Sequence, residues 1–297
     1  MTTANETAGR ADGRAGRGLF RRLRGFPLVS STFLLLVVVL GLAGPLLLPI
    51  DPYAGTLMTA LKPGIWADGG AWSHPLGTDQ LGRDLFSRLI VGARITMFIA
   101  VTGVAVSAAI GTAVGLVSGY LGGWADAVLM RLTDAMLAIP MLVLGLALAT
   151  AIGPGIANVI IVATAVNWAF FARLIRGEVL HIRELAYVSA AEVAGFSRLR
   201  ILVRHILPNV MTPLLVMASL QVGNTIILAS SLSFLGLGVP EPLPEWGLML
   251  ANSRDYLSFK PSLVVIPAVA LGMVVLSCNL LGDWLRDYLD PELGHLR

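Results

Sequence analysis

The sequence predicts an all-α integral membrane protein with six transmembrane helices and both termini in the cytoplasm. Composition is the first reason: 56% of the 297 residues are hydrophobic and 13% are charged, whereas about 25% are charged in an ordinary soluble domain. The second is that the apolar residues form long runs without a single charged side chain. The third is the uneven distribution of Lys and Arg between these runs.

The charge-free runs predict where the chain crosses the bilayer. A helix needs about 20 apolar residues to span the hydrocarbon core, and four of the five runs have room for one crossing each. The run between Asp134 and Arg173 is longer and contains Gly153-Pro154-Gly155, which breaks a helix and divides the run into two crossings. The six expected spans cover residues 28–49, 96–118, 129–151, 156–173, 209–235 and 263–283.

The first span could also be a cleaved signal peptide. Its apolar stretch exceeds the usual signal core of about 7–15 residues. Pro45 follows Ala43-Gly44, the best small-residue cleavage site, and disfavours cleavage there. We therefore expect a cytoplasmic basic tail, residues 1–27, followed by one membrane domain, residues 28–297.

The basic residues predict the orientation. With the N-terminus inside, 15 of the 21 Lys and Arg residues lie on the cytoplasmic side and 6 outside, as the positive-inside rule requires. Six arginines belong to the Gly/Ala-rich tail, which we expect to be disordered and to contact anionic lipid. A nucleic-acid-binding arm is the weaker interpretation, and we expect no nucleic-acid partner.

The sequence lacks the residues that ATP hydrolysis, proton-coupled transport, metal binding and disulfide formation require. The two lysines, Lys62 and Lys260, do not follow glycine, so the chain has no Walker phosphate loop. No carboxylate lies deep in an expected span, which disfavours a proton-coupled carrier. The four histidines show no metal-ligand spacing, and the lone cysteine, Cys278, excludes a disulfide framework. An enzyme is the weaker hypothesis, with no catalytic, cofactor or metal site expected.

Span 2 carries small residues at four-residue spacing, which form one ridge on a helix and allow close helix approach. This ridge could pack inside the bundle or against a second membrane subunit. Uncharged polar residues in spans 5 and 6 could bond neighbouring helices or line a wet translocation path. The ridge comprises Gly103, Ser107, Gly111, Gly115 and Gly119; the candidate path residues are Gln221, Asn224, Thr225, Ser230 and Asn279.

The expected cytoplasmic loop, residues 173–208, is long and rich in Arg and Glu. Gly195 suits the C-terminal cap of a short helix, and Ser197 suits the N-cap of the next. Ala190-Ala191 precedes the cap and presents a low-profile surface to a partner.

This loop resembles the signature of the inner-membrane permeases of binding-protein-dependent ABC importers: Glu-Ala-Ala, three residues, Gly, nine residues, Ile-x-Leu-Pro. Ala190, Ala191, Gly195 and Leu207-Pro208 match in register. Ser189 replaces the family's Glu and His205 replaces its Ile. The ending from Arg204 to Asn209 is similar to the dipeptide/oligopeptide/nickel branch.

Three further segments resemble that branch, and the resemblance covers about residues 72–292. They are His74–Asp79 with Gly82–Asp84 and Ser87-Arg88; Ser233–Gly238 with Trp246-Gly247; and Asn279–Asp283 with Leu285–Asp287 and Asp290-Pro291. The chain resembles the C-type subunit, the one with short external loops.

The resemblance implies a multi-pass protein of the bacterial cytoplasmic membrane with the type I importer permease fold. Its implied partners are a second homologous permease, two cytoplasmic ATPase domains that bind ATP and Mg, an external solute-binding protein and membrane lipid. The loop 173–208 would couple to the ATPases. The implied coupling residues are Ser189, Ala190, Ala191, Glu192, Gly195, His205 and Pro208.

The external segment before span 2 has two interpretations. Its charged residues could contact the solute-binding protein, or the segment could merely close the bundle. The residues concerned are Asp79, Arg83, Asp84 and Arg88. The implied cargo is a small peptide; a nickel chelate or a haem-type ligand carried by the same machinery is the alternative, followed by an ATP-independent channel or facilitator.

Overall fold

Helices build most of this computed structural model, which describes residues 26–47 and 50–289. The long helices are α2 (Leu28–Leu47), α3 (Leu85–Leu121), α4 (Gly123–Ala138), α5 (Met141–Ile152), α6 (Ile156–Ile182), α9 (Leu207–Phe234) and α11 (Ser262–Leu289). The short elements are the 3₁₀ helices Leu57–Thr59 and Arg254–Tyr256, α7 (Ala186–Val193), α8 (Arg198–Ile201), a π-helix (Leu202–Ile206) and α10 (Trp246–Ser253). The expected tail, except residues 26 and 27, and the segment 290–297 with Asp290-Pro291 lie outside the described residues.

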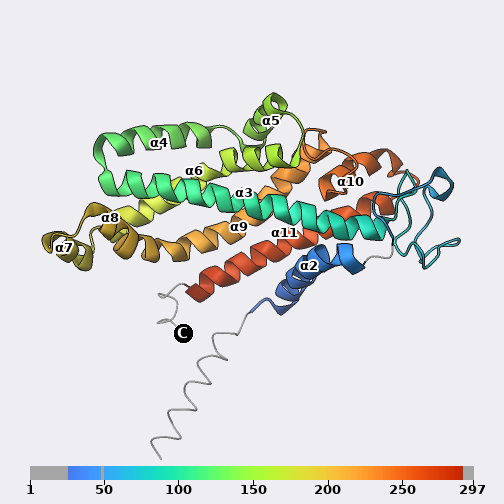
Figure 1. Ribbon diagram of the computed structural model, residues 1–297, viewed down its shortest axis with the longest axis horizontal. Coiled ribbons are helices and arrows are strands. Elements are labelled where there is room, and N and C mark those ends of the chain that lie inside the picture. Colours follow the sequence, from blue (N-terminus) through green and yellow to red (C-terminus); the bar gives the residue numbers. More distant parts are fainter. Residues whose placement is uncertain (1–25, 48–49, 290–297) are drawn as a thin grey trace, which may run out of the picture.

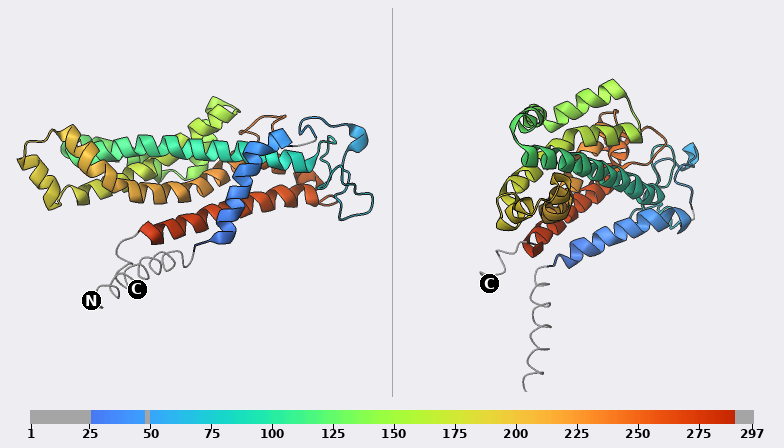
Figure 2. Two further views of the ribbon diagram at one scale, coloured as in Figure 1. Left: turned by 60° about the horizontal axis from the view of Figure 1, so that its bottom comes forward. Right: turned by 60° about the vertical axis from the view of Figure 1, so that its left-hand side comes forward.

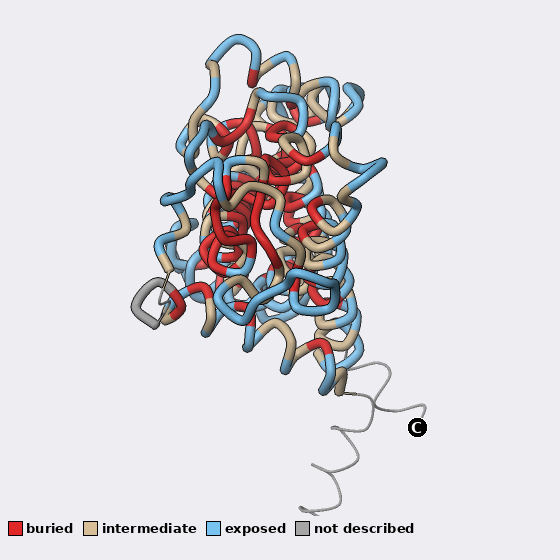
Figure 3. The backbone as a smooth tube through the Cα atoms, turned by 90° about the vertical axis from the view of Figure 1, so that its right-hand side faces the viewer, coloured by how far each residue is buried: buried red, intermediate tan, exposed pale blue. Residues whose placement is uncertain are grey.

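Helices α3, α6, α9 and α11 run side by side and place two functional regions at opposite ends of the bundle (Figure 1). Residues 50–84 and α10 lie at one end, the external one in the expected orientation. The pair α7–α8 lies at the other. Figure 2 shows α2 crossing the bundle at a steep angle, and Figure 3 shows buried residues filling the centre between the helices.

The small-residue ridge of α3 packs against α6. A Cβ added to Gly111 would lie 2.4 Å from Cβ of Phe171, and one added to Gly115 would lie 2.8 Å from the carbonyl oxygen of Ala172. Such distances leave no room for a side chain, so the two backbones approach closely. The ridge therefore serves packing inside the chain, and the alternative that it contacts a second subunit is wrong.

Within the described residues, four continuous helical segments are long and apolar enough to cross a membrane. They are α3, α6, the stretch Arg198–Phe234 that contains α9, and α11. Helix α3 begins at Leu85, well before the expected start at residue 96, because Asp84 caps it by accepting a hydrogen bond of 2.8 Å from the backbone N–H of Ser87.

The expected third span, residues 129–151, is wrong as a single helix. Helices α4 and α5 meet at Ile139-Pro140 with a bend of 94° and can form one broken span or a re-entrant loop. Proline lacks a backbone N–H and pushes the preceding residue out of helical geometry, and Ile139 is extended, with φ −89° and ψ 128°. The predicted span 129–151 did not take Pro140 into account.

Helix α2 lies within the first expected span, residues 28–49, and begins at its predicted start. It ends at Leu47, and residues 48–49 lie outside the described chain. Among the residues whose side chains are described, its apolar stretch is Leu28–Gly44.

Candidate functional site

Residues 183–206, which we call the cytoplasmic arm, connect α6 to α9. Helix α7 ends in a Schellman cap: Gly195 has φ +79°, its N–H donates to the carbonyl of Glu192 at 2.9 Å, and the N–H of Phe196 donates to the carbonyl of Ala191 at 3.1 Å. Ser197 then caps α8, its hydroxyl accepting from the backbone N–H of Arg200 at 3.4 Å. Both predicted caps are confirmed.

The two alanines before this cap face in different directions. Ala190 is exposed, whereas Ala191 is buried in a hydrophobic cluster that includes Val188 and Ile201. The expectation that Ala191 helps to present the docking surface therefore needs correction: it packs the arm together. The surface of the arm instead carries Val193, which is 91% exposed.

The polar coupling candidates of the arm have different environments. Ser189 and Glu192 are exposed, and the hydroxyl of Tyr120 at the end of α3 donates to Oε1 of Glu192 at 3.3 Å. His205 lies in the π-helix, its ring stacked at 6.0 Å on that of Phe196. In the sequence pattern of the family, the position of His205 is occupied by the apolar residue Ile.

The arm joins α9 through Pro208. This proline lies in the first turn of α9 and has no N–H with which to continue the hydrogen-bond ladder of the preceding π-helix. A π-helix immediately before it is an uncommon element that often marks functional positions. The arm and the central helix α9 are thus one continuous helical structure from Arg198 to Phe234.

A chain of amide side chains lies between α6 and α9. Asn224 donates to Oε1 of Gln221 at 2.7 Å, Gln221 donates to Oδ1 of Asn167 at 3.4 Å, and Asn167 donates to the hydroxyl of Thr225 at 3.0 Å. Asn224 is exposed and the other three are buried. Asn167 was not among the candidates predicted from the sequence, although it is a polar residue within an expected span.

The other two candidate path residues lie elsewhere. Ser230 is buried and donates to Oε1 of Glu245 at 3.4 Å. Asn279 of α11 faces α9, because a Cβ on Gly223 would lie 3.0 Å from its Oδ1. The structure thus brings Gln221, Asn224 and Thr225 together and does not include Ser230 in their chain.

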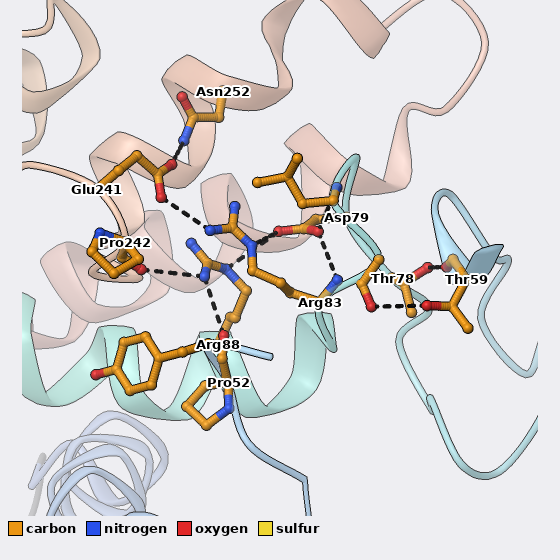
Figure 4. A network of polar contacts seen from close by, with 12 residues as sticks. Pro52, Thr59, Thr78, Asp79, Arg83, Arg88, Glu241, Pro242 and Asn252 are labelled. Carbon is orange, nitrogen blue, oxygen red and sulfur yellow. Dashed lines mark hydrogen bonds and ion pairs between the residues drawn. The ribbon is translucent and has the colours of Figure 1, made fainter. Parts of the chain in front are cut away.

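At the opposite end, four charged side chains form what we call the external ionic cluster: Asp79, Arg83, Arg88 and Glu241 (Figure 4). Nε of Arg83 lies 2.7 Å from Oδ2 of Asp79, and its Nη1 lies 3.0 Å from Oε2 of Glu241. Nε of Arg88 lies 3.5 Å from the same oxygen of Asp79, and its Nη1 donates to the carbonyl of Pro52 at 3.2 Å. With two arginines and two carboxylates, the cluster has no net formal charge.

Burial corrects the expectation that this segment touches an external protein through its charged side chains. Asp79, Arg83, Asp84 and Arg88 are only 5%, 4%, 1% and 1% exposed. Asp84 caps α3 and lies 3.0 Å from Nδ1 of His74. These groups instead hold the external segment onto the bundle, the second of the two interpretations.

Glu245 is a further buried carboxylate that the sequence analysis did not identify. It caps α10 by accepting from the backbone N–H groups of Gly247 and Leu248, both at 2.9 Å. The hydroxyls of Thr96 and Ser230 approach its Oε1 at 3.4 Å. Burial raises the pKa of Glu245 because it disfavours the charged form.

The comparisons with known proteins agree with this arrangement. Residues 111–295 match the family described as "Binding-protein-dependent transport system inner membrane component". The chain is 41% identical over 281 residues to the probable D,D-dipeptide transport system permease protein DdpC of Escherichia coli strain K12, covering 94% of this chain and 92% of that one. It is 42% identical over 261 residues to the di/tripeptide transport system permease protein DppC of Pseudomonas aeruginosa strain UCBPP-PA14, covering 88% and 86%.

A third relative is the glutathione transport system permease protein GsiD of Pectobacterium atrosepticum, 39% identical over 264 residues, covering 89% of this chain and 86% of that one. Among solved structures, a chain of the MetNI methionine ABC transporter in an inward-facing form gives a TM-score of 0.56 at 16% identity, covering 68% of this chain and 96% of that one. That likeness concerns the fold alone. The family match and the relatives show that this chain belongs to the inner-membrane components of binding-protein-dependent transport systems, and that it is a permease rather than an enzyme.

Proposed function

We propose that this permease forms half of a translocation path for small peptides or a related solute. A second homologous permease supplies the other half, an external solute-binding protein delivers the cargo, and two cytoplasmic ATPase domains bind ATP and Mg. The loop 173–208 couples the path to these ATPases. The names of the relatives, which are permeases for D,D-dipeptides, di- and tripeptides and glutathione, support a peptide cargo.

The observation that carries the coupling proposal is the construction of the cytoplasmic arm. It consists of two short capped helices that expose one large apolar side chain each: Val193 of α7 is 91% exposed and Leu199 of α8 is 71% exposed. Exposed apolar side chains outside the bilayer indicate a protein contact. Because the arm continues into α9, a force applied to it by a moving ATPase reaches the helix that carries the amide chain.

The amide chain supports the proposed path. Uncharged amides offer both hydrogen-bond donors and acceptors, which suits the peptide groups of a small cargo. Asn224 is the exposed member and is held by Gln221, which in turn bonds Asn167, and Asn167 bonds Thr225. Asn279 on α11 is the next candidate, and Ser230 stabilises the contact with Glu245.

Bulk on the arm tests the coupling. We expect Ala190→Trp to leave expression unchanged, because Ala190 is exposed, and to weaken docking about tenfold or more, since about 1.4 kcal/mol of misfit is sufficient. The measurements are co-purification of the ATPases and substrate-stimulated ATP hydrolysis in the complex. Asp287→Trp places the same bulk at another exposed position near the cytoplasmic end and should be neutral. Normal stimulation by Ala190→Trp would refute the coupling role.

Uptake tests the cargo. A strain lacking this chain should lose uptake of radiolabelled di- or tripeptides and regain it with the wild-type chain but not with an Asn224→Leu variant. A nickel chelate should not compete. Unchanged peptide uptake in the deletion strain, together with loss of nickel uptake, would replace the peptide by the alternative cargo.

A further inference from the structure

An apolar cavity lies between α2, α3 and α11. Its volume is about 460 Å³. Only nonpolar side chains and Trp246 line it, among them Leu40 of α2, Ile90 of α3 and Val269 and Ala270 of α11. The indole N–H of Trp246 donates to the carbonyl of Leu89 at 2.9 Å, so it presents no free polar group to the cavity.

The nonpolar lining of the cavity favours a hydrocarbon chain as its occupant. Apolar cavities exclude water and bind apolar molecules, and empty space of this size is destabilising. The volume falls in the range of about 300–1,000 Å³ that is typical of ligand sites. Leu36 of α2 and Val269 of α11 line the cavity and remain 52% exposed each, so the cavity opens between these two helices to the surroundings of the bundle, where lipid chains are available.

A cation lies beside the cavity. Arg94 follows Ile90 by one turn of α3, at the point where Gly41 of α2 crosses: a Cβ on Gly41 would lie 3.3 Å from the Cα of Arg94. Arg94 is exposed and forms no ion pair among the residues that the structure describes. It lies near the external end of α3, where a long side chain can reach the headgroup layer. A guanidinium binds phosphate oxygens bidentately.

We propose that this cavity and Arg94 form a binding site for one anionic phospholipid of the outer leaflet. One acyl chain fills the space between α2, α3 and α11, and the phosphate binds the guanidinium of Arg94. Charge complementarity favours a phospholipid over the other conceivable occupant, an apolar side chain of the second permease, because a side chain of that kind leaves the cation of Arg94 unpaired.

Photolabelling tests the site. The full chain is reconstituted in vesicles of phosphatidylethanolamine and phosphatidylglycerol that contain a trace of phosphatidylglycerol with a diazirine on one acyl chain. We expect labelled peptides from α2, α3 and α11. Ala270→Phe should reduce the labelling about tenfold by filling the cavity, and Ala270→Leu should reduce it less. Leu276→Phe, on an exposed position of the same helix outside the cavity, should retain it.

Two substitutions of Arg94 test the proposed contact with the lipid headgroup. Arg94→Gln should lower labelling by phosphatidylglycerol to the level given by a diazirine phosphatidylcholine, and Arg94→Lys should preserve the preference for the anionic lipid. Label spread evenly over the exposed surface, or undiminished in both Ala270 variants and in Arg94→Gln, would overturn the proposal. Loss of label on assembly with the second permease, with Val269→Cys crosslinking to that subunit, would overturn it in favour of a protein occupant. Gel filtration of each variant verifies folding, and none of these readouts depends on transport.

Discussion

The two ends of the bundle differ in whether their charged side chains are buried or exposed. At the external end, Asp79, Arg83 and Arg88 are buried and pair with one another and with Glu241. On the cytoplasmic arm the charged residues point outward, and the guanidinium of Arg200 lies 5.3 Å from the centre of the Phe196 ring on the surface. One end is held by buried ion pairs and the other by backbone caps over a small apolar core.

This difference indicates that the external end stabilises the fold and that the arm is adapted to contact a partner. The external ionic cluster ties together three parts of the chain that are distant in sequence: Pro52, the stretch from Asp79 to Arg88, and the loop before α10. Removing one partner of a buried pair leaves an uncompensated charge and is strongly destabilising. The arm keeps its surface free of such constraints, so its outer side chains can adapt to a partner without weakening the fold.

The largest expected effect separates the two ends across the membrane. In a Cys278→Ala background, Ala71→Cys and Ser258→Cys should label completely with a membrane-impermeant thiol reagent added to intact cells, because both positions are exposed at the external end. Ala194→Cys on the arm should label only after the cells are permeabilised. The reverse pattern would contradict the orientation derived from the positive-inside rule.

The next effect concerns the external ionic cluster. Arg88→Met should destabilise the protein by about 3–5 kcal/mol, because it leaves Asp79 with a reduced set of partners in a buried position. Thermal unfolding of the solubilised chain measures this. Arg254→Met is the matched control: its pair with Asp255 is exposed, and its loss should change stability by less than about 1 kcal/mol. Equal effects of the two substitutions would show that the cluster does not stabilise the external end.

A smaller, local effect is expected at the arm. A Cβ at Gly195 would meet no atom within 4 Å, but its φ of +79° strains other residues. Gly195→Val should therefore cost about 1–3 kcal/mol through the backbone alone, and Gly195→Asn should cost less because Asn tolerates this region. Hydrogen exchange should increase in α7 and α8 and remain unchanged in α3 and α6. Uniformly faster exchange in all helices would show that the arm is not an independent unit.

The smallest effect is a pH dependence at Glu245. Its pKa in the folded protein lies above the ordinary value of 4.5, so its contribution to stability is fully present below that value and is lost as the pH rises through the raised pKa. Glu245→Gln removes this component. The free energy of unfolding of the Gln variant, relative to wild type, should therefore increase with rising pH. A parallel pH dependence in the two proteins would show that Glu245 titrates normally.

Local features of the arm and the spans could be predicted from the sequence because they depend on a few consecutive residues. Charge-free runs indicate the long helices, and Gly195 and Ser197 indicate the caps, since each motif is closed by hydrogen bonds to residues within five positions. The break at Pro140 belongs to this class as well, and its local signal was overlooked.

Only the tertiary structure decided which side chains lie inside. The contact between Arg83 and Glu241 joins positions 158 residues apart, and the contact between Asn167 and Thr225 joins positions 58 apart. Likewise, neighbouring Ala190 and Ala191 differ in exposure only because one of them faces Val188 and Ile201. Burial depends on how whole helices pack, and helix packing brings together residues whose spacing along the chain follows no local rule. For this reason the charged side chains of Asp79, Arg83 and Arg88 became part of the interior, whereas the arm at the opposite end exposes the apolar Val193 and Leu199.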